Sequence, residues 1–92
     1  MMFKEIQWTE YMKYKIKMRG FDFSKIEHIL RYSNERYIDT ATNRIIVIGK
    51  HEKFLVLIPY EKNTHSITPI TIHVITRQQI NFRVKTGRFR HE

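Results

Sequence analysis

A chain of 92 residues has room for one domain with a single modest core. Its 17 Lys and Arg residues outnumber nine Asp and Glu residues, and the formal charge of +8 indicates a polyanionic partner such as RNA, DNA or an anionic membrane surface. The absence of cysteine excludes disulfides, thiolate metal sites and a cysteine nucleophile; with no signal-peptide pattern and no apolar run near the roughly 20 residues that span a bilayer, we expect a cytoplasmic protein without a membrane partner.

The N-terminal segment predicts an extended stretch and then a helix. Three apolar residues are typical of a short strand or an anchoring extended segment: Phe3, Ile6 and Trp8. Residues 9–19 alternate charged and apolar side chains in part, as a strand does, but they also fit a helix that is capped by Thr9 and ended by Gly20. We favour the helix, in which three side chains repeat at helical spacing: Tyr11, Tyr14 and Met18.

A second helix is predicted over residues 25–32. Ser24 and Glu27 fit the S-x-x-E capping box, in which the serine oxygen accepts a first-turn amide and the glutamate reaches back. Three aliphatic residues then repeat at helical spacing: Ile26, Ile29 and Leu30.

The middle of the chain predicts the strands of a sheet. Residues 44–49 and 53–60 are β-branched and aliphatic runs, and we interpret them as adjacent central strands. A short strand is expected over residues 36–39. After a polar loop at 61–66, residues 67–75 predict a third long strand.

The C-terminal segment predicts a basic helix directly after that strand. Thr76 and Gln79 fit the T-x-x-Q capping box, and the helix places Ile80 and Val84 on one face before it stops near Gly87. Unpaired amides at such a helix start favour an anion. The predicted fold is α+β, with two N-terminal helices, a three- to four-stranded mostly antiparallel sheet and a short C-terminal basic helix.

Positive charge is concentrated in the last third of the chain. No acidic residue lies between Glu61 and Glu92. The same interval contains six cations: Lys62, Arg77, Arg83, Lys85, Arg88 and Arg90. A solvated basic face that serves only solubility is the alternative to a polyanion-binding surface.

This order of features resembles the RelE/ParE superfamily of small bacterial and archaeal toxins, in particular its BrnT-like branch. The resemblance rests on FKEIQW at 3–8, on MRGFDFSKIEHIL at 18–30, and on a strand that leads into Thr76-Arg77 and a basic helix. It also rests on a D-x(4)-R-x(4)-G pattern: Asp39, Arg44 and Gly49.

The resemblance implies a single RelE-like domain over residues 1–92 that acts as the toxin of a type II toxin–antitoxin system. Such a toxin cleaves mRNA, free or on the ribosome, and is held inactive by a cognate antitoxin protein in a hetero-oligomer. Members of the superfamily also act on DNA gyrase, so a target other than RNA stays open.

The residue types of this chain can supply the groups that metal-independent RNA cleavage needs. Attack of the 2′-OH on the neighbouring phosphorus needs a proton acceptor, a cation beside the phosphorane and a proton donor for the leaving oxygen, without a cofactor. His73 is the candidate acid or base, with a packed strand histidine as the alternative. Arg77 is the candidate for holding the phosphate, with a structural ion pair to Glu35 or Asp39 as the alternative, and Arg83 is the candidate for stabilising the transition state.

Further cations are candidates for binding the RNA backbone. Lys50 and His51 follow a predicted strand and are expected at the rim of the site. Three more lie near the C-terminus, the last two in an expected mobile tail: Lys85, Arg88 and Arg90.

Other kinds of site lack their sequence patterns. The five histidines show no zinc-binding spacing, and neither a glycine-rich phosphate loop nor a nucleophile elbow is present. The aromatic residues of the first third are expected in the core. The alternative to a ribonuclease is a non-catalytic basic module that binds nucleic acid or a protein through the same face.

Overall fold

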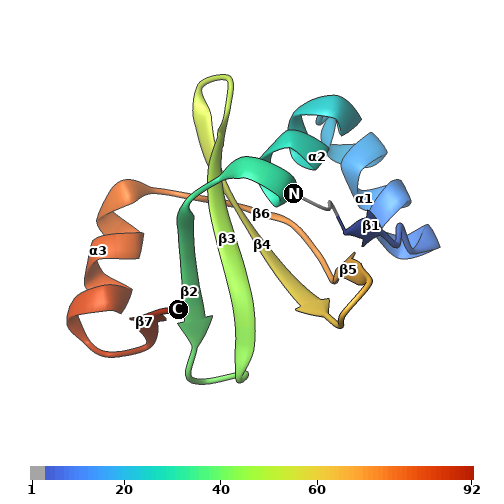
Figure 1. Ribbon diagram of the computed structural model, residues 1–92. Coiled ribbons are helices and arrows are strands. Elements are labelled where there is room, and N and C mark those ends of the chain that lie inside the picture. The colour runs from blue at the N-terminus through green and yellow to red at the C-terminus, as the bar shows by residue number, and fades with distance from the viewer. Residues whose placement is uncertain (1–3) are drawn as a thin grey trace.

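The computed structural model describes residues 4–92, so Phe3 of the expected first strand lies outside the described residues. The elements follow in the order β1 (Glu5–Ile6), α1 (Glu10–Arg19), α2 (Phe23–Tyr32), β2 (Glu35–Asp39), β3 (Arg44–His51), β4 (Phe54–Lys62), β5 (Ser66–Pro69), β6 (His73–Ile75), α3 (Arg77–Lys85) and β7 (Phe89–His91). The α+β class is confirmed, with α1 and α2 on one side of the sheet and α3 on the other (Figure 1).

Helix α1 begins and ends where the sequence predicts. The Thr9 side chain accepts a hydrogen bond from the backbone N–H of Met12, and Gly20 closes the helix in the left-handed conformation at φ 73°. The buried side of the helix carries Met12 and Ile16. The three residues expected on its packed face are exposed instead: Tyr11, Tyr14 and Met18.

Helix α2 begins two residues earlier than predicted, because Asp22 and not Ser24 is its N-cap. The Asp22 carboxylate accepts hydrogen bonds from the backbone N–H groups of Ser24 and Lys25 at 2.8 and 3.4 Å. The predicted aliphatic stripe is buried as expected: Ile26, Ile29 and Leu30.

The sheet has seven strands in the described residues, more than the three to four predicted. The path β1-β5-β4-β3-β2-β7 is antiparallel except at the β1–β5 pair, and β6 also pairs with β4. Strands β3 and β4 form the predicted central hairpin, and β2 covers the expected short strand with one more residue at its start.

The predicted single strand over 67–75 is wrong, because the chain forms two strands along the edge of β4. Strand β5 reaches its last pair at Tyr60–Pro69, and β6 pairs again from Leu57–His73. Three residues, 70–72, therefore lie opposite two, 58 and 59, which is a bulge. Pro59 and Pro69 have no N–H to donate to a ladder, so continuous pairing fails at this point.

The C-terminal helix begins at its predicted capping box, but the residues after it do not form a free tail. The predicted capping box is present in α3, where the Thr76 and Gln79 side chains each bond to the other's backbone N–H. Beyond Gly87 the chain forms β7, which adds to the edge of β2. Arg88 and Arg90 are therefore fixed to the sheet, and the expectation of a mobile tail is wrong.

Two apolar cores lie on opposite faces of the sheet. Helices α1 and α2 cover the core that contains Val47, Val56 and Ile58, and α3 covers the core that contains Ile46 and Leu57. Because successive side chains of a strand alternate between faces, this division assigns every strand residue to the α1/α2 face or to the α3 face. Among the described helices, none is long and apolar enough to cross a membrane.

Candidate nucleic-acid interface

His73 lies at the start of β6 on the α3 face of the sheet. Its register partner is Leu57, which belongs to the core under α3. The bulge before β6 determines this face, because Ile67 and Pro69 of β5 point to the α1/α2 side. His73 is exposed in spite of its position in the sheet, since β6 is short and lies at the edge of β4.

The charges of three cations act on the imidazole of His73. Partial burial lowers the pKa of His73 below its usual 6.5, and the charges of Lys15, Arg19 and Arg83 lower it further. Lys15 and Arg19 come from α1, whereas Arg83 comes from α3. His73 is therefore within reach of the charges of two helices that pack on opposite sides of the sheet, and at neutral pH its ring is mostly uncharged and can accept a proton.

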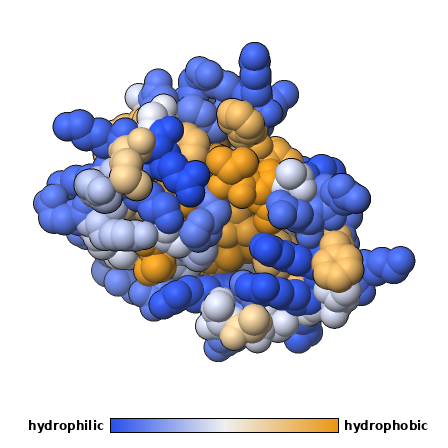
Figure 2. Space-filling view, turned by 180° about the vertical axis from the view of Figure 1, so that it is seen from behind, coloured by the Kyte–Doolittle hydropathy of each residue, from blue (hydrophilic) through white to orange (hydrophobic). Residues whose placement is uncertain are grey.

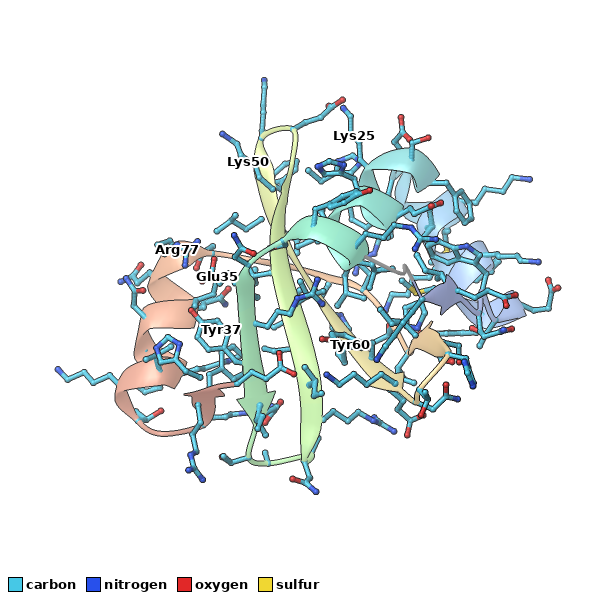
Figure 3. The ribbon with its side chains drawn as sticks, viewed as in Figure 1. Lys25, Glu35, Tyr37, Lys50, Tyr60 and Arg77 are labelled. Carbon is cyan, nitrogen blue, oxygen red and sulfur yellow. The ribbon has the colours of Figure 1, made fainter. Side chains whose placement is uncertain are left out.

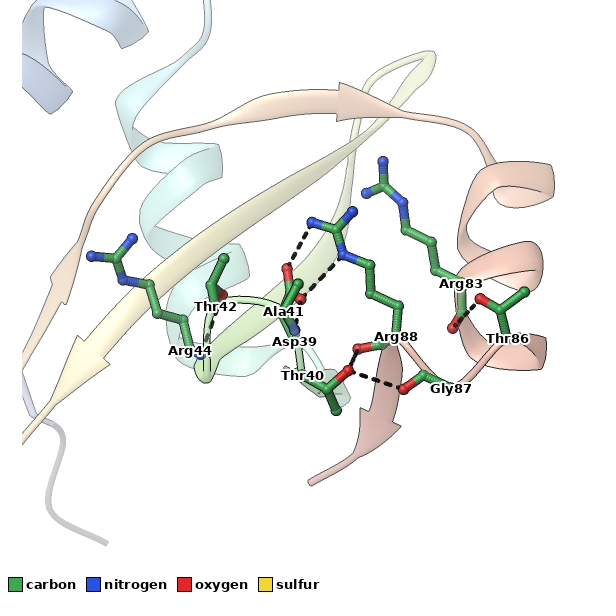
Figure 4. Close-up of polar contacts among 9 residues, drawn as sticks. All are labelled: Asp39, Thr40, Ala41, Thr42, Arg44, Arg83, Thr86, Gly87 and Arg88. Carbon is green, nitrogen blue, oxygen red and sulfur yellow. Dashed lines mark hydrogen bonds and ion pairs between the residues drawn. The ribbon is translucent and has the colours of Figure 1, made fainter.

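Two further arginines extend the positive surface from α3 to the turn between β2 and β3. In Figure 4 the side chains of Arg44, Arg83 and Arg88 extend toward the same side. The Arg88 guanidinium contacts both carboxylate oxygens of Asp39 at 3.2 Å. Burial raises the pKa of Asp39, but Arg88 and the N–H of Ala41 outweigh it, so the pKa lies below its usual value.

Arg83 is held in place by an aromatic ring and lines an open pocket. Its guanidinium carbon lies 5.4 Å from the ring centroid of Phe89, the buried first residue of β7. The pocket has a volume of about 490 Å³ and is lined by Gln78, Gln79, Phe82, Arg83, Thr86 and Arg88. Arg83 and three polar side chains in this open pocket can hold an anionic ligand, whereas Arg88 is paired with Asp39.

An apolar area lies on the surface of the molecule that faces away from the viewer in Figure 1. Figure 2 shows hydrophobic surface gathered at the centre of the rear view, with hydrophilic side chains around it. The exposed apolar residues of β4 and β6 are Phe54 and Val74, at 56% and 42% exposure, and both point to the α1/α2 side, because Val74 pairs with Val56 of that core and Phe54 lies two residues before Val56. His73 points to the other face, so this apolar area lies at the edge of the sheet and is not the floor under the imidazole.

Arg77 does not join this group, because it is paired with Glu35 at the start of β2. One guanidinium nitrogen donates to Glu35 Oε1 at 2.9 Å, and the other contacts Oε2. The Tyr37 hydroxyl donates to the same carboxylate at 2.7 Å. The structural ion pair considered for Arg77 is the arrangement that the structure contains (Figure 3).

His51 is also occupied by a structural contact and is not at a rim. It is 7% exposed, and its Nε2 accepts a hydrogen bond of 2.9 Å from the backbone N–H of Asp22. The ring packs edge-on against Phe21. His51 therefore joins the β3–β4 hairpin to the start of α2, whereas Lys50 is exposed near the tip of that hairpin (Figure 3).

The remaining predicted RNA-binding residues lie apart from His73. Lys85 is exposed in the last turn of α3. Arg90 pairs in register with Ile38, and because Phe89 points to the α3 face, Arg90 points to the opposite one. Of the other seven predicted site residues, Arg83 is the one whose charge acts on His73.

Three cations of this surface were not predicted. The packing of α1 brings the charges of Lys15 and Arg19 near His73, and no local sequence pattern predicts this packing. The four-residue spacing of the two residues predicts only that they share one face of a helix. Arg44 stands in the D-x(4)-R-x(4)-G pattern, which marked it without assigning it a role. Within residues 4–92, no three His, Asp or Glu side chains are grouped so that they could hold a metal ion.

Comparison with family models, with curated proteins and with solved structures finds no match to this chain.

Proposed function

We propose that this protein is an endoribonuclease that cleaves RNA through attack of the 2′-OH, without a metal, and that it acts as the toxin of a type II toxin–antitoxin system. The observation that carries the proposal is the position of His73, exposed on the sheet surface with cations from two helices around it. The toxin role rests on the RelE/ParE resemblance and brings an antitoxin protein as the expected partner.

The chemistry follows from the charge around His73. The neutral imidazole accepts the proton of the 2′-OH, and the 2′-oxygen then bonds to the phosphorus. Negative charge grows on the phosphorane oxygens, where Arg83 is the candidate to stabilise it, with Lys15 and Arg19 as further cations whose charges reach His73. The imidazolium returns its proton to the departing 5′-oxygen, which leaves a 2′,3′-cyclic phosphate and a 5′-hydroxyl.

Arg77 has a different role in this proposal from the one its sequence position suggests. Its guanidinium is committed to Glu35, and the pair ties the start of α3 to β2. Holding α3 in this way keeps Arg83 above the sheet face that carries His73, so Arg77 acts as a positioning residue.

A non-catalytic RNA-binding module is the second candidate, and one observation favours it. With Arg77 bound to Glu35, the helix start next to the candidate base has no uncommitted guanidinium. Phosphate binding by Arg83 does not depend on Arg77, so the surface can bind RNA whether or not it cleaves it.

The test is cleavage of end-labelled RNA by the purified protein, alone and with ribosomes, with the product termini mapped. We expect cyclic phosphate ends, no loss of rate in a metal chelator, and no cut at a position whose 2′-OH is replaced by hydrogen. His73→Ala should lower the rate roughly 100-fold or more, as the loss of a general base does. His65→Ala, an exposed histidine in the loop before β5, is the matched control and should leave the rate unchanged.

The pH dependence gives a second readout. Because cleavage requires neutral His73, kcat/KM should rise with pH through a pKa below 6.5 and then level off. Binding of RNA without cleavage in both conditions, or full activity in His73→Ala, would reject the ribonuclease and leave the binding module.

A further inference from the structure

Helix α1 presents aromatic side chains to solvent on the side next to His73. Tyr11, Tyr14 and Met18 are 55%, 62% and 59% exposed, so the expectation that the aromatic residues of the first third lie in the core is wrong for this helix. At 100° per residue, these three side chains and those of Lys15 and Arg19 fall on one continuous arc of the helix, next to the arc of the buried Met12 and Ile16. Exposed aromatic rings on a small protein call for an explanation.

The same helix is strongly cationic. It carries one carboxylate, that of Glu10, which lies 3.5 Å from the Lys13 ammonium. It carries four cations at alternating positions: Lys13, Lys15, Lys17 and Arg19. Rings interleaved with cations match a ligand that has flat aromatic groups on a polyanionic backbone, which describes single-stranded nucleic acid.

The position of this face relative to His73 is fixed by polar contacts. The Lys15 ammonium donates to the Thr71 hydroxyl at 3.1 Å, two residues before His73 in the chain. The same ammonium lies 5.8 Å from the ring centroid of Tyr11. Hydrogen bonds to Thr71 and to Lys15 lower the pKa of the Tyr11 hydroxyl. Tyr11 is thus held beside the bulge that positions His73.

A ring that is exposed but already oriented loses little conformational freedom when a base stacks on it. Stacking tolerates any base sequence, because every base has a π-face. It also requires an unpaired strand, since the bases of a duplex are already stacked on one another. The face of α1 therefore has the means to select single-stranded over double-stranded RNA.

We propose that Tyr11, together with Lys15 and Arg19, forms a base-stacking and phosphate-binding track for single-stranded RNA that continues from the His73 site along α1. The inference rests on the proposed function in one respect: the strand on α1 is the one whose phosphate lies at His73. Tyr11 is a binding residue, and the proton transfer is left to His73.

The experiment compares three tyrosine variants. Tyr11→Leu removes the ring, Tyr11→Phe keeps the ring and removes only the hydroxyl, and Tyr32→Leu changes a tyrosine of similar exposure on α2. Binding is measured with a labelled 2′-O-methyl RNA of roughly a dozen nucleotides, which has no free 2′-OH to be cleaved, and with the duplex of the same sequence. Cleavage kinetics are measured on the unmodified single strand, and the melting temperature of each variant is checked.

We expect Tyr11→Leu to weaken single-strand binding by roughly 5- to 100-fold, as loss of one stacked base does. Duplex binding should change less than twofold, as should single-strand binding by Tyr32→Leu. Tyr11→Phe keeps the ring but loses the hydroxyl contacts that orient it, so its single-strand binding should fall between that of the wild type and that of Tyr11→Leu. In cleavage, Tyr11→Leu should raise KM and leave kcat within about threefold.

The two proposals fail in different ways. If Tyr11→Leu binds the single strand like the wild type, the track on α1 is rejected even when RNA is cleaved. If the wild type binds the uncleavable RNA in a Tyr11-dependent way but cuts no RNA, the track holds and the ribonuclease is rejected. A wild type that prefers the duplex, or that binds no RNA at all, rejects the track and leaves this face to a protein partner.

Discussion

The Arg77 guanidinium makes two contacts with the Glu35 carboxylate, and the Tyr37 hydroxyl donates to the same group. The hydrogen bonds from Arg77 outweigh partial burial and lower the pKa of Glu35. Burial and the same carboxylate raise the pKa of the Tyr37 hydroxyl to about 12, so this hydroxyl stays protonated as a donor. At the residue scale, the nearest acidic side chain decides whether an arginine is structural or open to a ligand.

This ion pair predicts a defined pH dependence of stability. Glu35→Gln should lower the free energy of unfolding at pH 7 by about 0.5–1 kcal/mol, because the pair is bidentate but half of the Arg77 side chain is exposed. The pKa of Glu35 is lower in the folded state than its ordinary 4.5, so the contribution is complete above 4.5 and is lost as the pH falls through the folded-state value. Urea unfolding at pH 7 and pH 3 measures it.

Glu61→Gln, at the exposed end of β4, is the matched control for the Glu35 variant. If Glu35→Gln lowers the free energy of unfolding by the same amount at pH 7 and at pH 3, the substitution acts through packing and not through the charge of the pair.

At the scale of elements, the helices are fixed by their caps and by one close approach to the sheet. A Cβ atom on Gly49 of β3 would come within 2.5 Å of the buried side chain of Ile29, so glycine lets α2 pack tightly on the sheet. The start of α2 is fixed by Asp22, whose carboxylate caps the helix and whose N–H donates to His51. One residue thus joins the helix to the β3–β4 hairpin.

The two candidate caps of α2 can be told apart by mutation. Asp22→Ala should lower the free energy of unfolding by about 1 kcal/mol, because it removes the acceptor of two first-turn N–H groups. Ser24→Ala should change it by less than about 0.5 kcal/mol, because Ser24 lies inside the helix. Denaturant midpoints of both variants measure the difference. An equal loss in Ser24→Ala would restore the S-x-x-E box as the cap.

At the scale of the whole molecule, the cations behind the formal charge of +8 differ in what they contact and in which face they point to. Some cations are committed to carboxylates, as Arg77 is to Glu35 and Lys62 is to Glu92. Others border the α3 face beside His73, whereas Arg90 points to the opposite face. Binding of RNA should therefore depend on the position of each cation and not on the net charge.

A pair of charge-matched variants tests this dependence. Arg83→Gln should weaken RNA binding and reduce the slope of log K against log salt by about 0.7, the value for one phosphate of a single strand. Arg90→Gln removes the same charge from the other face of the sheet and should leave the slope unchanged. Fluorescence titrations of labelled RNA at several salt concentrations measure both. Equal slopes for the two variants would show that only the net charge matters.

Much of the fold could be predicted from the sequence, because its signals are local. The capping box at Thr76 and the glycine after α1 act within one helical turn, and the β3–β4 hairpin joins neighbouring strands. The α+β class, the three helices and the central strands follow from such signals. In the candidate site, local charge pointed to the last third of the chain, which contains His73 and Arg83.

What local signals could not supply are pairings between distant residues. Strand β7 exists because β2, about fifty positions earlier, offers a free edge. Arg77 forms an ion pair with Glu35 of β2, and His51 accepts a hydrogen bond from the backbone N–H of Asp22. His73 faces the α3 side because one extra residue, beside two prolines, shifts the alternation of the edge strand. The sequence by itself determined the elements, since helical turns and hairpins form between neighbours, whereas only the tertiary structure decided which side chains meet at His73, since they come from helices on opposite sides of the sheet.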